Sequence, residues 1–340
     1  MKKVVLVGMV ALAAGFSSAQ QRTLTVVTHD SFNLSKEIVQ AFEKKENIKL
    51  AFIKGGDAGA MTNRLILTAQ NPIADAVYGI DNTLLARALN AGIFEPYRPK
   101  AAGLLEKNTL LDSKWRISPV DYGYVALNYD LAWFEKNKLA LPKTLEDLTQ
   151  PAYKGLLVVQ NPATSSPGLA FLLSTIKHFG ETRAFAFWEA LKKNDLKITS
   201  GWETAYYTDF SRNGGSRPIV VSYASSPAAE VFYGDGKTPS TANLLLPGSS
   251  FLQIEGVAVL KGTKNPDLAK KFVDFMLEPQ TQADIPTQMW VYPSRKDIAL
   301  PDVFKFAEKP TQISSLAPST IAKNEKRWVQ RWVEVVLQNR

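Results

Sequence analysis

Short apolar stretches alternate with amphipathic stretches near the start of the chain, and this alternation limits the possible folds more than any other feature. Residues 24–28, 50–53 and 74–78 have the length and the apolar content of buried strands. Between the first two, Ile38 and Phe42 recur at helical spacing, with charged residues around them. Strands that alternate with helices of this length pair in parallel βαβ units. The sequence therefore predicts an α/β fold.

Two later extended stretches predict that the chain builds two lobes. Residues 121–130 lie where the first group of units should end, and residues 256–260 follow a second group of strands and helices. We expect both stretches to cross between the lobes. Lobe 1 would then comprise residues 20–123 and 256–340, and lobe 2 residues 124–255. A cleft between lobes that are joined by crossing strands can close on a ligand.

A strand that leads into Ser, Ser and Pro occurs twice in the predicted second lobe. Residues 156–160 run into Ser165, Ser166 and Pro167, and residues 219–221 run into Tyr223, Ala224, Ser225, Ser226 and Pro227. Ser is a preferred helix N-cap and Pro suits the first turn, so each stretch predicts a helix start with free backbone N–H groups. Open α/β sheets bind ligands at the carboxyl ends of their strands. Together with Trp202 and Tyr223, the two helix starts predict a ligand cleft with an anion-binding end.

The first 19 residues have the pattern of a secretory signal peptide. Lys2 and Lys3 precede an apolar run over residues 4–16, and the small residues Ser17 and Ala19 follow it. The run is too short to span a bilayer comfortably, and no later stretch approaches 18 unbroken apolar residues. We therefore expect an exported, periplasmic protein that is cleaved after Ala19. The chain has no Cys, which excludes a lipidated Cys, disulfides and thiol chemistry.

Composition and motifs argue against nucleic-acid binding and against catalysis. The formal charge of +8 is spread thinly, without a long Lys/Arg block. The chain contains no Gly-x-Ser-x-Gly elbow and no His-Glu-x-x-His helix. It has only two His residues and no nucleophile paired with a base. We expect a monomeric binding protein rather than an enzyme, with no cofactor and no bound metal.

Seven short motifs occur in the order seen in the family of thiamine-binding periplasmic proteins, which the mature sequence resembles over nearly its whole length. They are residues 28–32 (THDSF), 79–82 (GIDN), 121–124 (DYGY), 166–168 (SPG), 201–203 (GWE), 222–227 (SYASSP), and 285–287 (IPT) with 290–293 (WVYP). The resemblance implies the two-lobed, type II periplasmic-binding-protein fold. It also implies that the protein captures thiamine, thiamine monophosphate and thiamine diphosphate, and delivers them to the membrane permease of an ABC importer.

The same resemblance assigns residues to the ligand site. The ligand-binding positions are Asp57, Ala58, Ser165, Ser166, Trp202, Tyr223, Ala224, Ser225 and Ser226, and further contacts are His29 and Trp290. Asp57 suits both a ligand contact and a cap of the following helix. Two positions depart from the family: His29 stands where a Tyr stacks on the ligand, and Ala229 where another aromatic residue can occur. These departures bear on stacking and on the relative affinity for thiamine and its phosphates.

A ferric-ion-binding periplasmic protein of the same fold is the alternative. Tyr206 and Tyr207 are adjacent phenols, which can supply hard oxygen ligands to iron. Neighbouring residues on a helix point about 100° apart, however, and only His29 and His178 are available as imidazole ligands. We therefore favour thiamine over iron.

Overall fold

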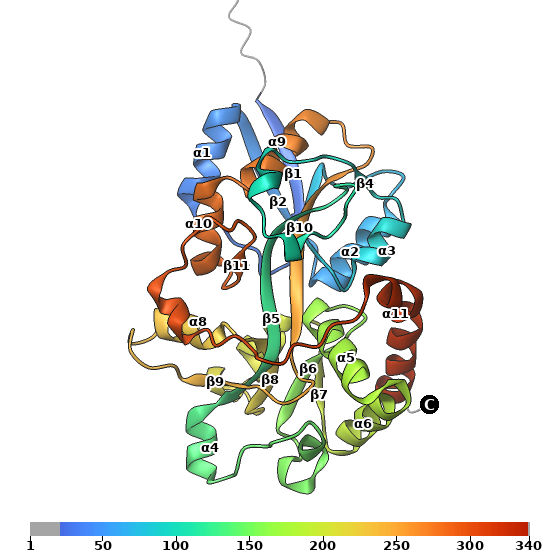
Figure 1. Ribbon diagram of the computed structural model, residues 1–340, viewed down its shortest axis with the longest axis vertical. Coiled ribbons are helices and arrows are strands. Elements are labelled where there is room, and N and C mark those ends of the chain that lie inside the picture. The colour runs from blue at the N-terminus through green and yellow to red at the C-terminus, as the bar shows by residue number, and fades with distance from the viewer. Residues whose placement is uncertain (1–20, 339–340) are drawn as a thin grey trace, which may run out of the picture.

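The computed structural model describes residues 21–338, so the predicted signal peptide lies outside the described residues. Figure 1 shows two lobes, one above the other, with strands β5 (Ser118–Asp130) and β10 (Phe251–Leu260) running from one to the other. None of the helices within the described range combines the length and the apolar character needed to cross a bilayer. The two-lobed α/β architecture agrees with the fold predicted from the sequence.

The sheet of the first lobe is built from the predicted βαβ units. Its strands lie in the order β2 (Ile48–Lys54), β1 (Arg22–Thr28), β3 (Ala76–Asp81) and β10. Strand β1 pairs in parallel with both β2 and β3, and β10 pairs antiparallel to β3. The short strands β4 (Phe94–Glu95) and β11 (Tyr292–Pro293) pair with β10 and β5.

Side chains of β1 alternate between two apolar layers, which explains why this strand is apolar throughout. Leu24 and Val26 are fully buried in one cluster with Phe272, and Val27 is fully buried in a second cluster with Met61 on the other face. The helices of this lobe are α1 (Lys36–Glu46), α2 (Ala58–Leu67), α3 (Leu85–Asn90), α9 (Pro266–Met276) and α10 (Pro279–Gln288). The carboxyl ends of β1 and β2 lie at the cleft between the lobes, since the residues that follow them, such as His29 and Asp57, line it.

The second lobe continues the sheet beyond β5. Strand β8 (Ile219–Tyr223) pairs antiparallel to β5, and β6 (Leu157–Gln160) pairs in parallel with both β8 and β7 (Lys197–Thr199). Strand β9 (Thr241–Leu244) also pairs with β5. The helices are α4 (Leu131–Asn137), α5 (Ser166–Phe179), α6 (Glu181–Lys193), α7 (Trp202–Thr204), α8 (Ser226–Tyr233) and α11 (Pro318–Trp332).

The two Ser-Ser-Pro segments leave the sheet at the same edge because β6 and β8 are parallel neighbours. Helix α5 begins after β6, and helix α8 begins after β8. Strands β5 and β10 contain the two stretches that the sequence predicts as crossings, and they pair with each other from Val125 opposite Phe251 to Ser118 opposite Val257. The register shifts between Glu255 and Gly256, so the crossing strands are irregular beside the cleft.

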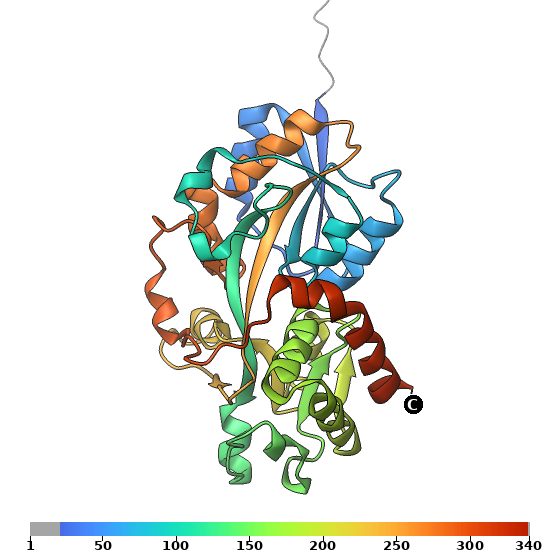
Figure 2. The ribbon, with the colours of Figure 1, turned by 45° about the vertical axis from the view of Figure 1, so that its right-hand side comes forward.

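The last helix packs on both lobes, on α3 of the first, where Arg87 pairs with Glu325, and on α6 of the second, whereas the sequence places its residues with the first lobe alone. Trp332 is fully buried, with its ring centroid 5.5 Å from that of Trp188 on α6. The indole N–H of Trp328 donates to Glu181 at the start of α6. Figure 2 shows α11 running down beside the helices of this lobe. The apolar stripe of α11 is buried in part against α6. An apolar stripe predicts that a helix is buried on one side, but chain order alone does not specify which lobe supplies the covering surface.

Candidate functional site

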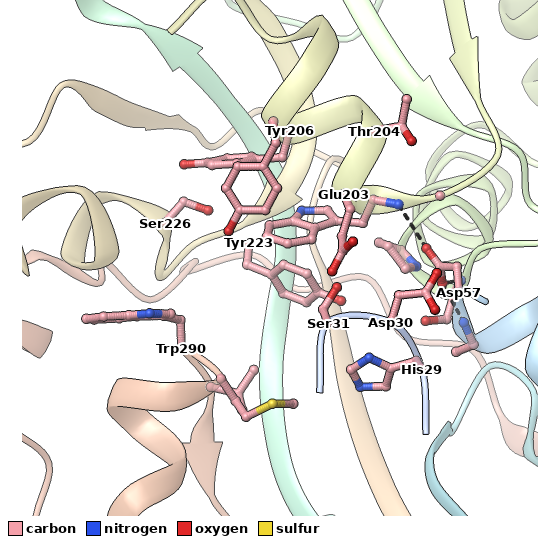
Figure 3. Close-up of a pocket in the computed structure, with 18 of the residues that line it drawn as sticks. His29, Asp30, Ser31, Asp57, Glu203, Thr204, Tyr206, Tyr223, Ser226 and Trp290 are labelled. Atoms are coloured by element: carbon pink, nitrogen blue, oxygen red, sulfur yellow. Dashed lines mark hydrogen bonds between the residues drawn. The ribbon is translucent and has the colours of Figure 1, made fainter. Parts of the chain in front are cut away.

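A cavity of about 570 Å³ lies between the lobes, and both contribute to its wall. It is lined by most of the side chains that the sequence singled out: His29, Asp57, Ala58, Ser166, Trp202, Tyr223, Ser225, Ser226 and Trp290. Ser165 and Ala224 do not line it; both are fully buried behind the wall. Figure 3 shows Asp57 and Trp290 at opposite ends of the cavity, with Tyr223 between them.

Aromatic rings from the second lobe form one wall of the cavity. Trp202 stacks on Tyr206 with ring centroids 5.1 Å apart and an interplanar angle of 20°. The indole N–H of Trp202 donates to Ser222 Oγ at 2.9 Å, and the Tyr223 hydroxyl donates to Gln253 Oε1 at 2.8 Å. Burial raises the pKa of Tyr223 well above its usual value, so the phenol stays neutral at physiological pH. These contacts fix flat apolar surfaces beside the cavity.

Trp290 brings an indole from the first lobe. Its backbone has φ 58°, in the left-handed region, which is uncommon for a bulky residue and is found at sites under functional constraint. The ring lies parallel to Phe304, with an angle of 9° and centroids 6.0 Å apart. The Ser225 hydroxyl donates to the Trp290 carbonyl oxygen, and this bond joins the lobes at this end of the cavity.

At the other end, Asp57 accepts hydrogen bonds from both lobes. Its Oδ1 accepts from the backbone N–H of Ala58, the first residue of α2, at 2.6 Å, and from that of Ser166 at 3.3 Å. Its Oδ2 accepts from the backbone N–H of Trp202 at 2.9 Å. The pKa of Asp57 is raised overall, because burial outweighs the lowering by the N–H groups of Trp202 and Ala58, the Ser165 hydroxyl and the charge of His29. The residue therefore caps its own helix, as the sequence allowed, and also bridges the cleft.

Backbone contact between the lobes continues along α2. The N–H of Ala60 donates to the carbonyl oxygen of Thr164, which precedes α5, at 2.9 Å. Gly59 makes this approach possible, because a Cβ at this position would lie 2.6 Å from the Thr164 carbonyl carbon. A second glycine, Gly201, lies close to the side chain of Asp57. A Cβ at Gly201 would lie 3.2 Å from the Cβ and from the Oδ2 of Asp57.

A group of buried acids lies behind the cavity, and one of them, Glu255, lines it. Glu255 of β10 lies 3.3 Å from His29 Nε2, although the pair lacks hydrogen-bond alignment. Beneath it, the Tyr78 hydroxyl donates to Asp121 Oδ2 at 2.6 Å. Burial and the charge of Glu255 raise the pKa of Asp121 well above its usual value. Burial lowers the pKa of His29, but Glu255 outweighs this effect and the net shift is upward.

The resemblance places His29 where the family has a stacking Tyr, and in the structure its imidazole lies 3.3 Å from Glu255. Sequence reasoning did not identify Glu255 as part of the site. The available signal was a carboxylate inside the largely apolar segment that ends at Leu260. A charge in a strand that is buried on both sides needs a partner, and His29 is that partner here.

The two Ser-Ser-Pro segments are connected through one amide. Gln253 Nε2 donates to Ser166 Oγ at 2.8 Å, and Gln253 Oε1 accepts from Tyr223. The expectation that serine hydroxyls cap these helices needs correction, since neither Ser165 nor Ser225 makes a side-chain cap bond. Asp57 fills that role at α5, and the Ser225 hydroxyl is used across the cleft.

The adjacent phenols that favour iron are not arranged as ligands. The Tyr206 hydroxyl donates to Glu230 Oε1 at 2.9 Å, and burial raises its pKa well above the usual value, which opposes a phenolate. The Tyr207 side chain is 59% exposed. Within residues 21–338, no three His, Cys, Asp or Glu side chains are grouped so that they could hold a metal ion.

The chain is similar in sequence and in structure to known binding proteins. A family model described as a bacterial extracellular solute-binding protein matches residues 71–315. The thiamine-binding periplasmic protein of Brucella suis biovar 1 is 36% identical over 323 residues, 92% of this chain and 91% of that protein. A solved periplasmic thiamin binding protein superimposes with a TM-score of 0.81 at 32% identity, covering 94% of this chain and 98% of that one. Iron-bound HitA from Pseudomonas aeruginosa has a TM-score of 0.74 at 23% identity over 93% of this chain and 100% of its own, which shows the shared fold alone.

Proposed function

The chain belongs to the bacterial extracellular solute-binding proteins and, within them, to the family of thiamine-binding periplasmic proteins; from this premise we propose that it captures thiamine in the cleft between its lobes. The observation that carries the proposal is the lining of that cleft, where aromatic rings and carboxylates surround a cavity of about 570 Å³. This volume lies within the range of small-molecule sites.

The residue types of the lining suit a flat cation. Thiamine carries a permanent positive charge on its thiazolium ring, next to an aminopyrimidine. The acidic residues that line the cavity are Asp30, Asp57, Glu203, Glu230 and Glu255, and the basic ones are His29 and Arg212. An indole or phenol face within about 6 Å of a cation contributes roughly 0.5 to 2 kcal/mol. Trp202 and Tyr223 present such faces, and the excess of carboxylates balances the ring charge.

The protein's place in transport follows from the same family. We propose that it is exported through the signal peptide at residues 1–19, acts as a monomer in the periplasm and delivers its ligand to the permease of an ABC importer. Its own role is binding rather than catalysis, and a separate ATPase would supply the energy. Thiamine monophosphate and diphosphate contain the same two rings, so they are also candidate ligands.

Calorimetry with purified protein tests the binding directly. Thiamine is expected to bind at or below micromolar levels and to quench tryptophan fluorescence. Replacing Trp202 by Ala removes the stacking face and should weaken binding more than tenfold. Trp133→Ala on α4 is the matched control, since that residue does not line the cavity. An unchanged affinity of Trp202→Ala would contradict this assignment of the site.

Iron remains the second candidate because the fold is shared with ferric-ion binders. Adding a ferric salt to the protein would give a visible phenolate-to-iron absorption band if Tyr206 and Tyr207 were ligands. We expect no such band, since Tyr206 is buried and bonded to Glu230. A stoichiometric band together with no heat of binding for thiamine would reverse the assignment.

A further inference from the structure

The last helix, α11, touches the first lobe outside the cavity, where its start lies just below α3 (Figure 1), and an ion pair joins the two helices. We propose that Arg87 of α3 and Glu325 of α11 form a clasp that is fastened only when the lobes are together. They would then act as positioning residues, which raise the affinity for the ligand without touching it. The inference rests on the proposed function, because its effect is measured through the binding of thiamine.

Helix α11 and the residues that follow it are fixed to α6 of the second lobe by several contacts. Trp332 is fully buried against an indole of α6, and the guanidinium of Arg327 pairs with Glu181, the first residue of α6. Past the end of α11, the Lys192 ammonium donates to the carbonyl oxygen of Val335 at 3.1 Å. When the lobes move relative to one another, α11 therefore moves with the second lobe.

Arg87 connects α11 to the first lobe through both terminal nitrogens of its guanidinium. Its Nη2 donates to Glu325 Oε1, and its Nη1 donates to Asn63 Oδ1 on α2 at 2.6 Å. Glu325 is only 6% exposed, and neither member of the ion pair lines the cavity. A carboxylate that is buried so deeply needs a charged partner. The pair can supply that partner only while α3 and α11 are in contact.

The clasp lies beside the contact through which α2 meets the second lobe at the cleft. The N–H of Ala60 donates to the carbonyl oxygen of Thr164 at 2.9 Å, and Asn63 follows on the same helix. Asn63 and Gly59, whose close approach permits that bond, are four residues apart, so they lie on the same face of α2 about 6 Å from each other along its axis. A movement that separates α2 from Thr164 therefore also moves Arg87 away from α11.

Removing one member of the pair should favour the open arrangement. In the closed arrangement the remaining charge stays largely buried without its partner, whereas in the open arrangement it regains water. The ligand needs the closed form, so its affinity falls with the population of that form. Loss of a hydrogen bond between charged groups should therefore weaken the binding of thiamine roughly tenfold.

Calorimetric titration of thiamine into the wild type, Arg87→Gln, Glu325→Gln and the double variant tests the inference. Each single variant should bind roughly tenfold more weakly than the wild type. The double variant should bind no more weakly than the weaker single variant, because the second change removes a charge that already lacks its partner. Stopped-flow tryptophan fluorescence should show the loss in the dissociation rate, because the ligand enters the open form, in which the clasp is already apart.

Arg327→Gln is the matched control for these variants. It also removes an Arg–Glu pair of α11, but one that holds the helix to α6 of the second lobe. Its affinity for thiamine should equal that of the wild type. An equal loss of affinity in Arg327→Gln would show that any loosening of α11 weakens binding, and would overturn the assignment to the clasp.

The outcomes separate this inference from the proposed function. Unchanged affinity in both single variants would overturn the inference and leave the proposed function standing, since a pair that stays intact in the open form stabilises the fold without affecting binding. Tighter binding, or losses that add fully in the double variant, would also overturn it. Absence of thiamine binding by the wild type would overturn the proposed function and this inference with it.

A milder variant decides the question if the two Gln variants do not fold. Arg87→Lys keeps the charge but offers one nitrogen in place of two, so it cannot hold Asn63 and Glu325 in the same way. Its affinity for thiamine should fall at least about threefold, with the loss again in the dissociation rate. An affinity equal to that of the wild type would contradict the clasp.

Discussion

Replacing Gly59 by Ala tests whether contact between the lobes controls ligand affinity. The added Cβ would lie 2.6 Å from the Thr164 carbonyl carbon, 2.7 Å from its oxygen and 3.0 Å from the Ser165 nitrogen. All three atoms belong to the backbone of the other lobe, so no side chain can rotate away. The lobes would have to separate by roughly 0.8 Å at this point to restore ordinary van der Waals contact.

The cost of that separation follows from the bonds that it breaks. The Ala60–Thr164 backbone bond is worth about 1 kcal/mol, and a bond to the Asp57 carboxylate about 1.5–3 kcal/mol. Losing or weakening these bonds raises the free energy of the closed arrangement by about 2–4 kcal/mol. Because a ligand that needs the closed form binds in proportion to its population, the dissociation constant for thiamine should rise roughly 30- to 1000-fold.

Calorimetry with thiamine measures the affinity, and thermal unfolding separates it from stability. Ala is a better helix former than Gly by about 1 kcal/mol, so α2 itself should not be weakened, and the melting temperature should fall by no more than the lost bonds between the lobes account for. Gly103→Ala is the matched control, since a Cβ at Gly103 meets nothing within 4 Å. If Gly59→Ala bound thiamine as tightly as the wild type, closure through this contact would not control affinity.

Two further predictions concern stability. Burial raises the pKa of Asp81 from 3.8 to about 7, so the folded state holds a proton more tightly than the unfolded state does. Its contribution to stability is present below about pH 4 and is lost as the pH rises through 7, on the order of 4 kcal/mol in total. Urea unfolding should show this decline, and a flat profile between pH 4 and 8 would contradict it. Trp332→Ala should lower the free energy of unfolding by about 3–5 kcal/mol, because Trp332 is fully buried against Trp188; a loss below 1 kcal/mol would show that α11 does not stabilise the second lobe.

Local sequence patterns were sufficient to predict the strands and helices of the two lobes and many of the residues that line the cavity. Apolar stretches such as residues 24–28 become strands because burial on both faces requires them to be apolar throughout. Trp202 and Tyr223 lie at the cleft because each follows or ends a strand at the same sheet edge. These features depend on residues that are close in the sequence, and periodicity reports them directly.

Local patterns could not predict contacts between residues that lie far apart in the sequence. Asp57 is bonded to Ser166 and Trp202, which lie 109 and 145 positions further along the chain. The pairing of His29 with Glu255 is of the same kind. Whether a carboxylate meets a ligand, a helix start or an imidazole depends on how the lobes are placed, and that placement is a property of the whole fold. The packing of α11 on α6 has the same origin.

A crystal structure of the protein with thiamine tests the central claim most directly, namely that a flat cation lies in the cleft between the two lobes. The account predicts electron density for the vitamin between Trp202 and Trp290, with the Asp57 carboxylate still bonded to the backbone N–H of Trp202. Thiamine bound outside the cleft, or an occupied cleft in which the indole of Trp202 touches no part of the ligand, would contradict it.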